Sequence, residues 1–152
     1  EYLGYPKGLK LTANISTLVP KAHTAFQWAA MNDFAEIKRK QQLIIAAKKI
    51  RKINYRFHDA ETSILEAVLA RGDRRVGQII KNAYEAGCVF DGWLEHFNWE
   101  KWQETFVKNN AVYQDSLKEL SVDQELPWDN IQTGVPKGYL INEYQKALAI
   151  LG

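Results

Sequence analysis

Apolar and polar residues alternate most clearly near the start of the chain. From Leu9 to Ile15 every second residue is apolar, and the residues between are polar. This period of two predicts a β-strand. We expect the strand to continue to Val19 and to end at Pro20, because proline cannot donate to a ladder. The stretch Ile53–Phe57 alternates in the same way and predicts a second strand.

A helical pattern separates these two strands. Asp33 and Glu36 have the spacing of a capping box, and the helix is expected to run to about Arg51. A strand, a helix and a strand in this order predict a parallel unit with a right-handed crossover, so that both strands end on one side of the sheet. We therefore expect His23 and His58, which follow the two strands, to lie on the same rim.

The rest of the chain predicts mainly helices. Residues that favour helix N-termini occur at Ser63, Asp73 and Asn98, and a last helix is expected from about Pro136 onward. The segment Cys88–Phe90 is expected to form a short strand. The overall prediction is an α/β part followed by a mostly helical part.

The loop after the first strand carries most of the candidate chemistry. Within the eight residues Lys21–Trp28 it holds a cation, an imidazole, a hydroxyl, an amide and an indole. In α/β proteins, loops at the carboxyl ends of strands commonly form the functional site. We expect Lys21 and His23 to hold an anionic or polar group, with Gln27 and Trp28 shaping the rim. The alternative is that the aromatic residues cap the core and the histidine lies on the surface.

A second candidate is a helix–helix corner that carries three arginines, Arg71, Arg74 and Arg75. Arginine at a helix N-terminus works against the helix macrodipole, so two of them indicate a compensating anion from the protein or from a ligand. The intramolecular alternative is pairing with a neighbouring carboxylate such as Asp73.

Charge is divided unevenly along the 152 residues. Residues 1–75 contain 14 lysines and arginines against 7 aspartates and glutamates, whereas residues 76–152 contain 6 against 11. Either the two halves attract each other, or the basic half meets an anionic partner. One hypothesis is therefore a stand-alone module that binds a phosphate-bearing partner such as RNA. Another is an interaction domain whose loop is inert.

The sequence argues against several classes of site. It contains one cysteine, Cys88, and three histidines scattered one per segment, so we expect no internal disulfide, no cysteine-held cluster and no metal site. It contains no GxGxxG, GxxxxGK(S/T), HExxH or GxSxG motif. No apolar run is long enough to span a membrane and no signal peptide is recognisable, so we expect a cytoplasmic location.

The string VPKAHTAFQW, residues 19–28, resembles the VPKPHTPFQW signature of an uncharacterised family of radical S-adenosylmethionine (SAM) proteins. The chain differs at Ala22 and Ala25, where the family tends to have proline, so the loop is expected to be less rigid. The resemblance covers roughly Leu11 to Leu148. Its further stretches follow in order: Arg39–Gln42, His58–Asp59, Leu69–Arg75, Phe90–Trp93 with Glu95–Phe97, Leu126–Asp129 and Thr133–Val135.

The resemblance implies a longer parent protein with a cobalamin-binding-like N-terminal region and a radical SAM barrel. In such a barrel a CxxxCxxC motif holds a 4Fe–4S cluster, and this chain lacks the motif. The resemblance thus implies a partial (β/α) barrel in residues 1–58, formed by late strands and their crossover helix, with a helical extension in residues 59–152. The chain is expected to be an excised piece whose open strand edges self-associate.

On this reading the parent is an enzyme that cleaves SAM reductively and abstracts hydrogen from an unknown substrate, and it uses the cluster, SAM and in some members cobalamin. The chain itself is expected to contribute no catalytic residue and no metal ligand. Its partner is expected to be the rest of the parent chain. The side chains that the resemblance and the pattern together assign to SAM or substrate are Lys21, His23, Gln27, Trp28, His58, Arg71, Arg74 and Arg75.

Overall fold

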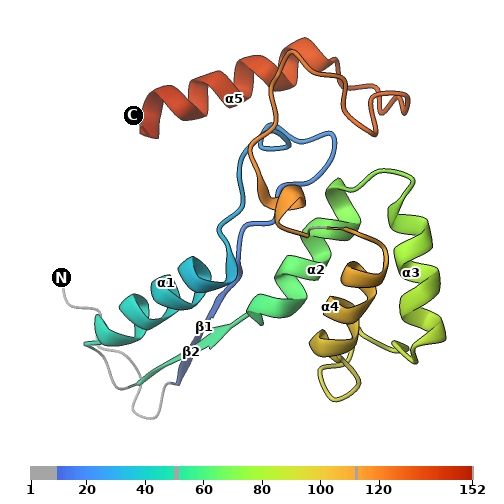
Figure 1. The fold of residues 1–152 in the computed structure, drawn as a ribbon. Helices are drawn as coiled ribbons and strands as arrows, with labels where there is room; N and C mark the ends of the chain where they lie inside the picture. Colours follow the sequence, from blue (N-terminus) through green and yellow to red (C-terminus); the bar gives the residue numbers. More distant parts are fainter. Residues whose placement is uncertain (1–9, 50–51, 112, 152) are drawn as a thin grey trace.

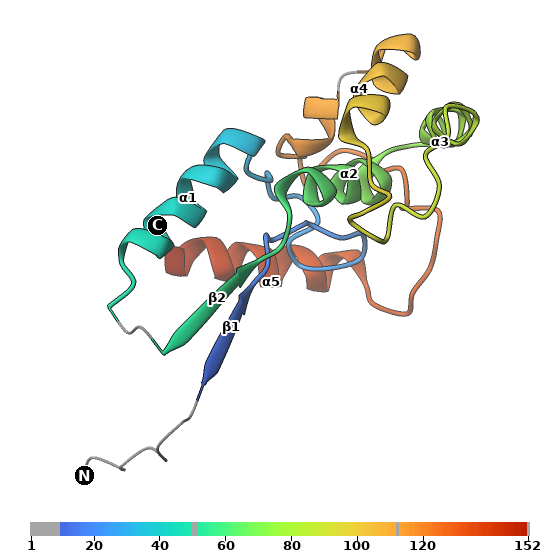
Figure 2. The same cartoon turned by 90° about the horizontal axis from the view of Figure 1, so that it is seen from below.

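The computed structural model describes residues 10–49, 52–111 and 113–151. Leu9, where the first predicted strand begins, lies outside these residues. The first predicted helix was expected to run to about Arg51, but it ends at Ala46. Two strands, β1 (Leu11–Ile15) and β2 (Ile53–Phe57), flank the helix α1 (Phe34–Ala46) in the sequence. Figures 1 and 2 show α1 beside this pair of strands.

The predicted parallel pairing of the two strands is confirmed. Leu11 lies opposite Ile53 and Ile15 lies opposite Phe57, and the residues between them pair in the same register. Asp33 caps α1 by accepting a 2.8 Å hydrogen bond from the backbone N–H of Glu36. The strand–helix–strand order was therefore read correctly from the period of two and the capping residue.

The predicted partial (β/α) barrel is wrong. The described residues form a small open sheet of two strands, and helices make up most of the remaining regular structure. The first strand also ends at Ile15 instead of Val19. A strand can extend only as far as its partner, and here β2 ends at Phe57 because Asp59 caps the next helix two residues later. The last backbone bond of the pair runs from the N–H of His58 to the carbonyl of Ile15 at 3.1 Å.

The predicted strand at Cys88–Phe90 is also absent from the part of the chain that the structure describes. Phe90 has a φ of 60°, in the left-handed region, which breaks an extended backbone. The segment instead forms an irregular connection to the next helix.

The remaining helices form two groups (Figures 1 and 2). Helices α2 (Ala60–Arg71), α3 (Val76–Glu85) and α4 (Trp99–Lys108) pack together, followed by the 3-10 helix η1 (Tyr113–Leu117). Helix α5 (Lys137–Leu151) lies apart from them, across the loop that follows β1. None of the described helices is both long and apolar enough to cross a membrane.

The buried apolar residues form three clusters. One lies between α1 and α2, and a second lies among α2, α3 and α4. The third joins the loop after β1 to the C-terminal part of the chain, and its buried members are Trp28, Leu126, Trp128, Leu140 and Tyr144. This third cluster packs against the loop after β1, which carries most of the candidate site residues.

Candidate functional site

The loop after β1 folds back on itself at His23. The backbone of His23 has a φ of 57°, a conformation that few residues other than glycine adopt. Its N–H donates a 3.0 Å hydrogen bond to the side-chain oxygen of Gln27, which holds the turn closed. The hydroxyl of Thr24 adds a 2.8 Å bond to the carbonyl of Lys21. Local hydrogen bonds therefore fix the loop in place of the two prolines that the resemblance leads one to expect.

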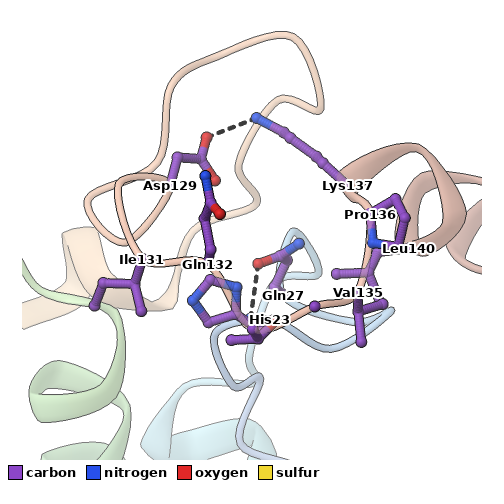
Figure 3. Close-up of a pocket in the computed structure, with 11 residues that line it drawn as sticks. His23, Gln27, Asp129, Ile131, Gln132, Val135, Pro136, Lys137 and Leu140 are labelled. Carbon is purple, nitrogen blue, oxygen red and sulfur yellow. Dashed lines mark hydrogen bonds and ion pairs between the residues drawn. The ribbon is translucent and has the colours of Figure 1, made fainter.

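Gln27 also joins the loop to the far end of the chain. The side chain is 2% exposed, and its oxygen accepts a second hydrogen bond, 2.7 Å long, from the indole N–H of Trp128. Both donors are N–H groups, which can only donate. This fixes the amide orientation, because a flipped amide would set its NH₂ against two donors. The NH₂ group therefore lies on the other side of the amide from the bonded oxygen, and Figure 3 shows it turned away from the bond with His23.

Across from His23 and Gln27, an ion pair forms a second wall of the site. Lys137, the first residue of α5, donates a 2.7 Å hydrogen bond to Oδ2 of Asp129 and a 3.2 Å bond to the carbonyl of Gln124. The backbone N–H of Leu126 donates to the same carboxylate oxygen at 3.0 Å. Burial alone would raise the pKa of Asp129, but these two hydrogen bonds and the charges of Lys137 and His23 outweigh it, so the pKa lies below its usual range.

A pocket of about 420 Å³ lies between these two walls (Figure 3). His23 and Gln27 line one side, Asp129 and residues 131–136 line the other, and Lys137 and Leu140 of α5 complete it. The volume falls within the range of small-molecule sites, roughly 300–1,000 Å³. The Nε2 atom of His23 is buried and has no hydrogen-bond partner among the described residues.

Arg71 supports the loop from beneath. It is 6% exposed, and its two terminal nitrogens donate to the carbonyls of Ala29 at 2.7 Å and of Lys118 at 2.8 Å. Burial lowers the pKa of Arg71, and the nearby Tyr144 phenol acts in the opposite direction. Two backbone bonds run alongside, from the N–H of Leu120 to Trp28 and from the N–H of Met31 to Leu117. Arg71 is thus a clamp between two loops and lies away from the pocket lining.

Two other predicted residues lie elsewhere. Lys21 forms an exposed ion pair with Glu66 of α2 and lines a different hollow on the surface. Trp28 is fully buried in the third core cluster, where its ring lies 5.8 Å from that of Tyr144. Of the four loop residues singled out in the sequence, His23 and Gln27 reach the pocket.

His58 does not join His23 in this pocket. Its Nδ1 lies 3.0 Å from the hydroxyl of Ser63, which itself donates to the carbonyl of Asp59 at 2.7 Å. Since the serine proton is already donated to Asp59, the bond requires a proton on His58 Nδ1. The hydrogen bonds among His58, Ser63 and Asp59 thus close the first turn of α2.

Arg74 and Arg75 are exposed at the corner between α2 and α3. Arg75 forms a 2.8 Å ion pair with Asp73, and its backbone N–H donates to the same carboxylate at 2.9 Å. These hydrogen bonds, led by that of the Arg75 side chain, lower the pKa of Asp73. The intramolecular pairing considered for this corner is therefore present for Arg75.

Sequence reasoning missed Asp129, Lys137 and the role of Trp128. The stretch Leu126–Asp129 was one of those that carry the resemblance, but nothing in its spacing shows that it folds onto residue 23. A buried hydrogen bond between residues 101 positions apart leaves no local signal in one sequence.

The residues present do not fit an iron–sulfur cluster, which several thiolates hold. The sequence has one cysteine, Cys88, and its side chain lies in the second core cluster. Burial raises the pKa of its thiol, and the charge of Asp91 adds to the effect. Within residues 10–49, 52–111 and 113–151 no three His, Cys, Asp or Glu side chains gather as a metal site.

Comparison with known proteins identifies no relative: no protein-family model, no curated protein and no solved structure matches the chain.

Proposed function

We propose that the chain is a segment of a radical SAM enzyme and that it supplies a pocket for a polar part of the substrate. The supporting observation is the convergence of two stretches that carry the resemblance. Residues 19–28 lie about a hundred positions from residues 126–129 and 133–135, yet Gln27 and Trp128 share a buried hydrogen bond, and residues of these stretches line one pocket. Resemblance in two segments that meet in space favours a common site over two unrelated structural motifs.

In this proposal the chain's residues bind and orient, while the radical chemistry belongs to the rest of the parent protein. His23 and Gln27 offer polar groups at one wall, and the Asp129–Lys137 pair fixes the other. A rigid binding wall lowers the entropic barrier of a reaction by holding the reacting part of a substrate in place. Arg71 and the third core cluster keep the two loops in register.

The test uses the full-length protein from the gene that encodes this chain. The proposal requires a CxxxCxxC motif upstream of residue 1 and reductive cleavage of SAM by the reconstituted protein. His23→Asn should lower substrate-dependent turnover at least tenfold and leave the iron and sulfide content unchanged. His96→Asn, at an exposed histidine on another surface, is the matched control. An upstream sequence without the motif, or full turnover in His23→Asn, would overturn the proposal.

A further inference from the structure

We infer that the pocket between Gln27 and Lys137 binds the carboxylate group of a small molecule that also has an apolar part. The inference names the ligand class for the pocket in the proposed function and rests on that pocket, but its test needs neither SAM nor the parent protein. It comes from the hydrogen-bonding capacity that remains in the pocket after the internal bonds are formed.

Gln27 supplies a fixed donor. Its oxygen is occupied by the N–H groups of His23 and Trp128, at 3.0 and 2.7 Å. Only the NH₂ end is left for a ligand, and Figure 3 shows it turned away from the bonded oxygen, on the Leu140 side of the view. An NH₂ group can only donate, so the ligand must present an acceptor oxygen here.

His23 supplies a second polar group. Its Nε2 atom is buried without a hydrogen-bond partner among the described residues, a state that costs free energy unless a ligand or water satisfies it. A proton on Nε2 makes the ring a donor toward an acceptor oxygen. One wall of the pocket thus carries the amide donor of Gln27 and the imidazole ring of His23.

The charge of the pocket favours one negative charge over none or two. Asp129 and Lys137 neutralise each other at 2.7 Å, and the carboxylate accepts a further bond from Leu126. A carboxylate brings one negative charge, and the NH₂ of Gln27 forms a stronger hydrogen bond with a charged oxygen than with a neutral carbonyl. A dianionic phosphate would place a second negative charge near Asp129, and the described residues of the pocket lining include no further lysine or arginine to offset it.

The walls between the polar groups are apolar. Ile131, Val135 and Leu140 line the pocket together with Pro136. With a volume of about 420 Å³ the pocket can hold a ring or a branched chain beside the carboxylate. Benzoate has this combination, and benzamide and phenyl phosphate have the same ring with a neutral or a dianionic head group.

The experiment titrates the 152-residue chain with each of these three probes and follows backbone amide signals by NMR. Benzoate should bind at least tenfold more tightly than benzamide or phenyl phosphate, and should shift the signals of His23, Gln27 and residues 131–137. Gln27→Glu keeps an oxygen for both N–H donors but replaces the NH₂ with a second acceptor, so it should weaken benzoate binding at least tenfold.

A second variant covers the case in which Gln27→Glu unfolds. His23→Asn tolerates the left-handed backbone and lacks the Nε2 position, and it should also weaken benzoate binding at least tenfold. His96→Asn should bind like the wild type. Equal binding of benzoate and benzamide, tighter binding of phenyl phosphate, no binding at all, or wild-type binding by His23→Asn would each overturn the carboxylate assignment. These outcomes leave the SAM-cleavage test of the parent protein unaffected, so the two proposals can fail separately.

Discussion

The indole nitrogen of Trp128 lies 2.7 Å from the side-chain oxygen of Gln27, in a buried hydrogen bond that spans 101 positions of the sequence. The same oxygen accepts the backbone N–H of His23 at 3.0 Å. One atom therefore holds both walls of the pocket at a fixed distance. The loop at His23 is thus tied to the C-terminal loop through this one oxygen.

Replacing Gln27 should therefore cost stability. Gln27→Leu fills a similar volume but leaves the buried indole N–H of Trp128 and the partly buried N–H of His23 without an acceptor. We therefore expect the free energy of unfolding to fall by about 2–4 kcal/mol. Gln145→Leu, at an exposed position of α5, should change it by less than about 0.5 kcal/mol. Urea unfolding of both variants measures the difference. Equal stability of the two would show that the buried bond contributes nothing.

Substitutions of the arginines at the helix corner should differ sharply in their effect on stability. Arg71→Met removes the donors to the carbonyls of Ala29 and Lys118 and should destabilise the fold by about 2–4 kcal/mol. Arg74→Met, with the same chemical change at an exposed site, should stay within about 0.5 kcal/mol of wild type. Thermal unfolding followed by circular dichroism compares them. A stable Arg71→Met variant would contradict the clamp.

Two glycines offer a matched test of packing at the same corner. A Cβ on Gly72 would lie 2.1 Å from Cγ2 of Val76 and 2.7 Å from the carbonyl oxygen of Val68, so Gly72→Ala should destabilise by about 1–3 kcal/mol. A Cβ on Gly77 meets nothing within 4 Å. Because alanine favours helix, Gly77→Ala should leave stability unchanged or raise it by up to about 1 kcal/mol. Denaturant titration resolves the opposite signs, and similar losses in both variants would refute the contact.

The Asp129–Lys137 pair predicts a pH-dependent contribution to stability. The pKa of Asp129 is lower in the folded protein than in the unfolded chain, so the ionised form stabilises the fold fully above the unfolded pKa of about 4. This contribution is lost as the pH falls through the folded pKa. Asp129→Asn should thus cost about 1 kcal/mol at pH 7 and progressively less toward pH 2.

Unfolding free energies of wild type and Asp129→Asn, measured from pH 7 to pH 2, test this directly. Asp123→Asn, at an exposed position six residues earlier, serves as the control. A difference between wild type and Asp129→Asn that stays constant across the range would exclude the charge as its cause.

Local chemistry made part of the fold predictable. The alternation at Leu11–Ile15 and Ile53–Phe57 identified both strands, and the Asp33 and Asn98 caps lie where the sequence placed them. The helix after β2 was expected from Ser63 but begins at Ala60, because Asp59 accepts the N–H of Thr62 and caps it one turn earlier.

The site was less predictable because its partners are distant in the sequence. A period of two identifies a strand but not the number of its neighbours, so a βαβ unit is compatible with both a barrel and a two-stranded sheet. Polar residues in the loop after β1 were candidates, yet whether each would reach the pocket depended on residues beyond position 115. Trp28 packs on Tyr144 and is buried, whereas His23 faces the loop around Asp129.

The separation of the two pocket walls also dictates when the site can form during synthesis. Gln27 leaves the ribosome about a hundred residues ahead of Trp128, an interval of roughly 5–20 s at ordinary elongation rates. Throughout that interval the side-chain oxygen of Gln27 lacks its second donor, the indole N–H of Trp128, and Trp28 lacks the core residues Leu126, Leu140 and Tyr144. The pocket is thus among the last parts of this chain to assemble, and a ribosome that stops before Leu126 releases a chain without it.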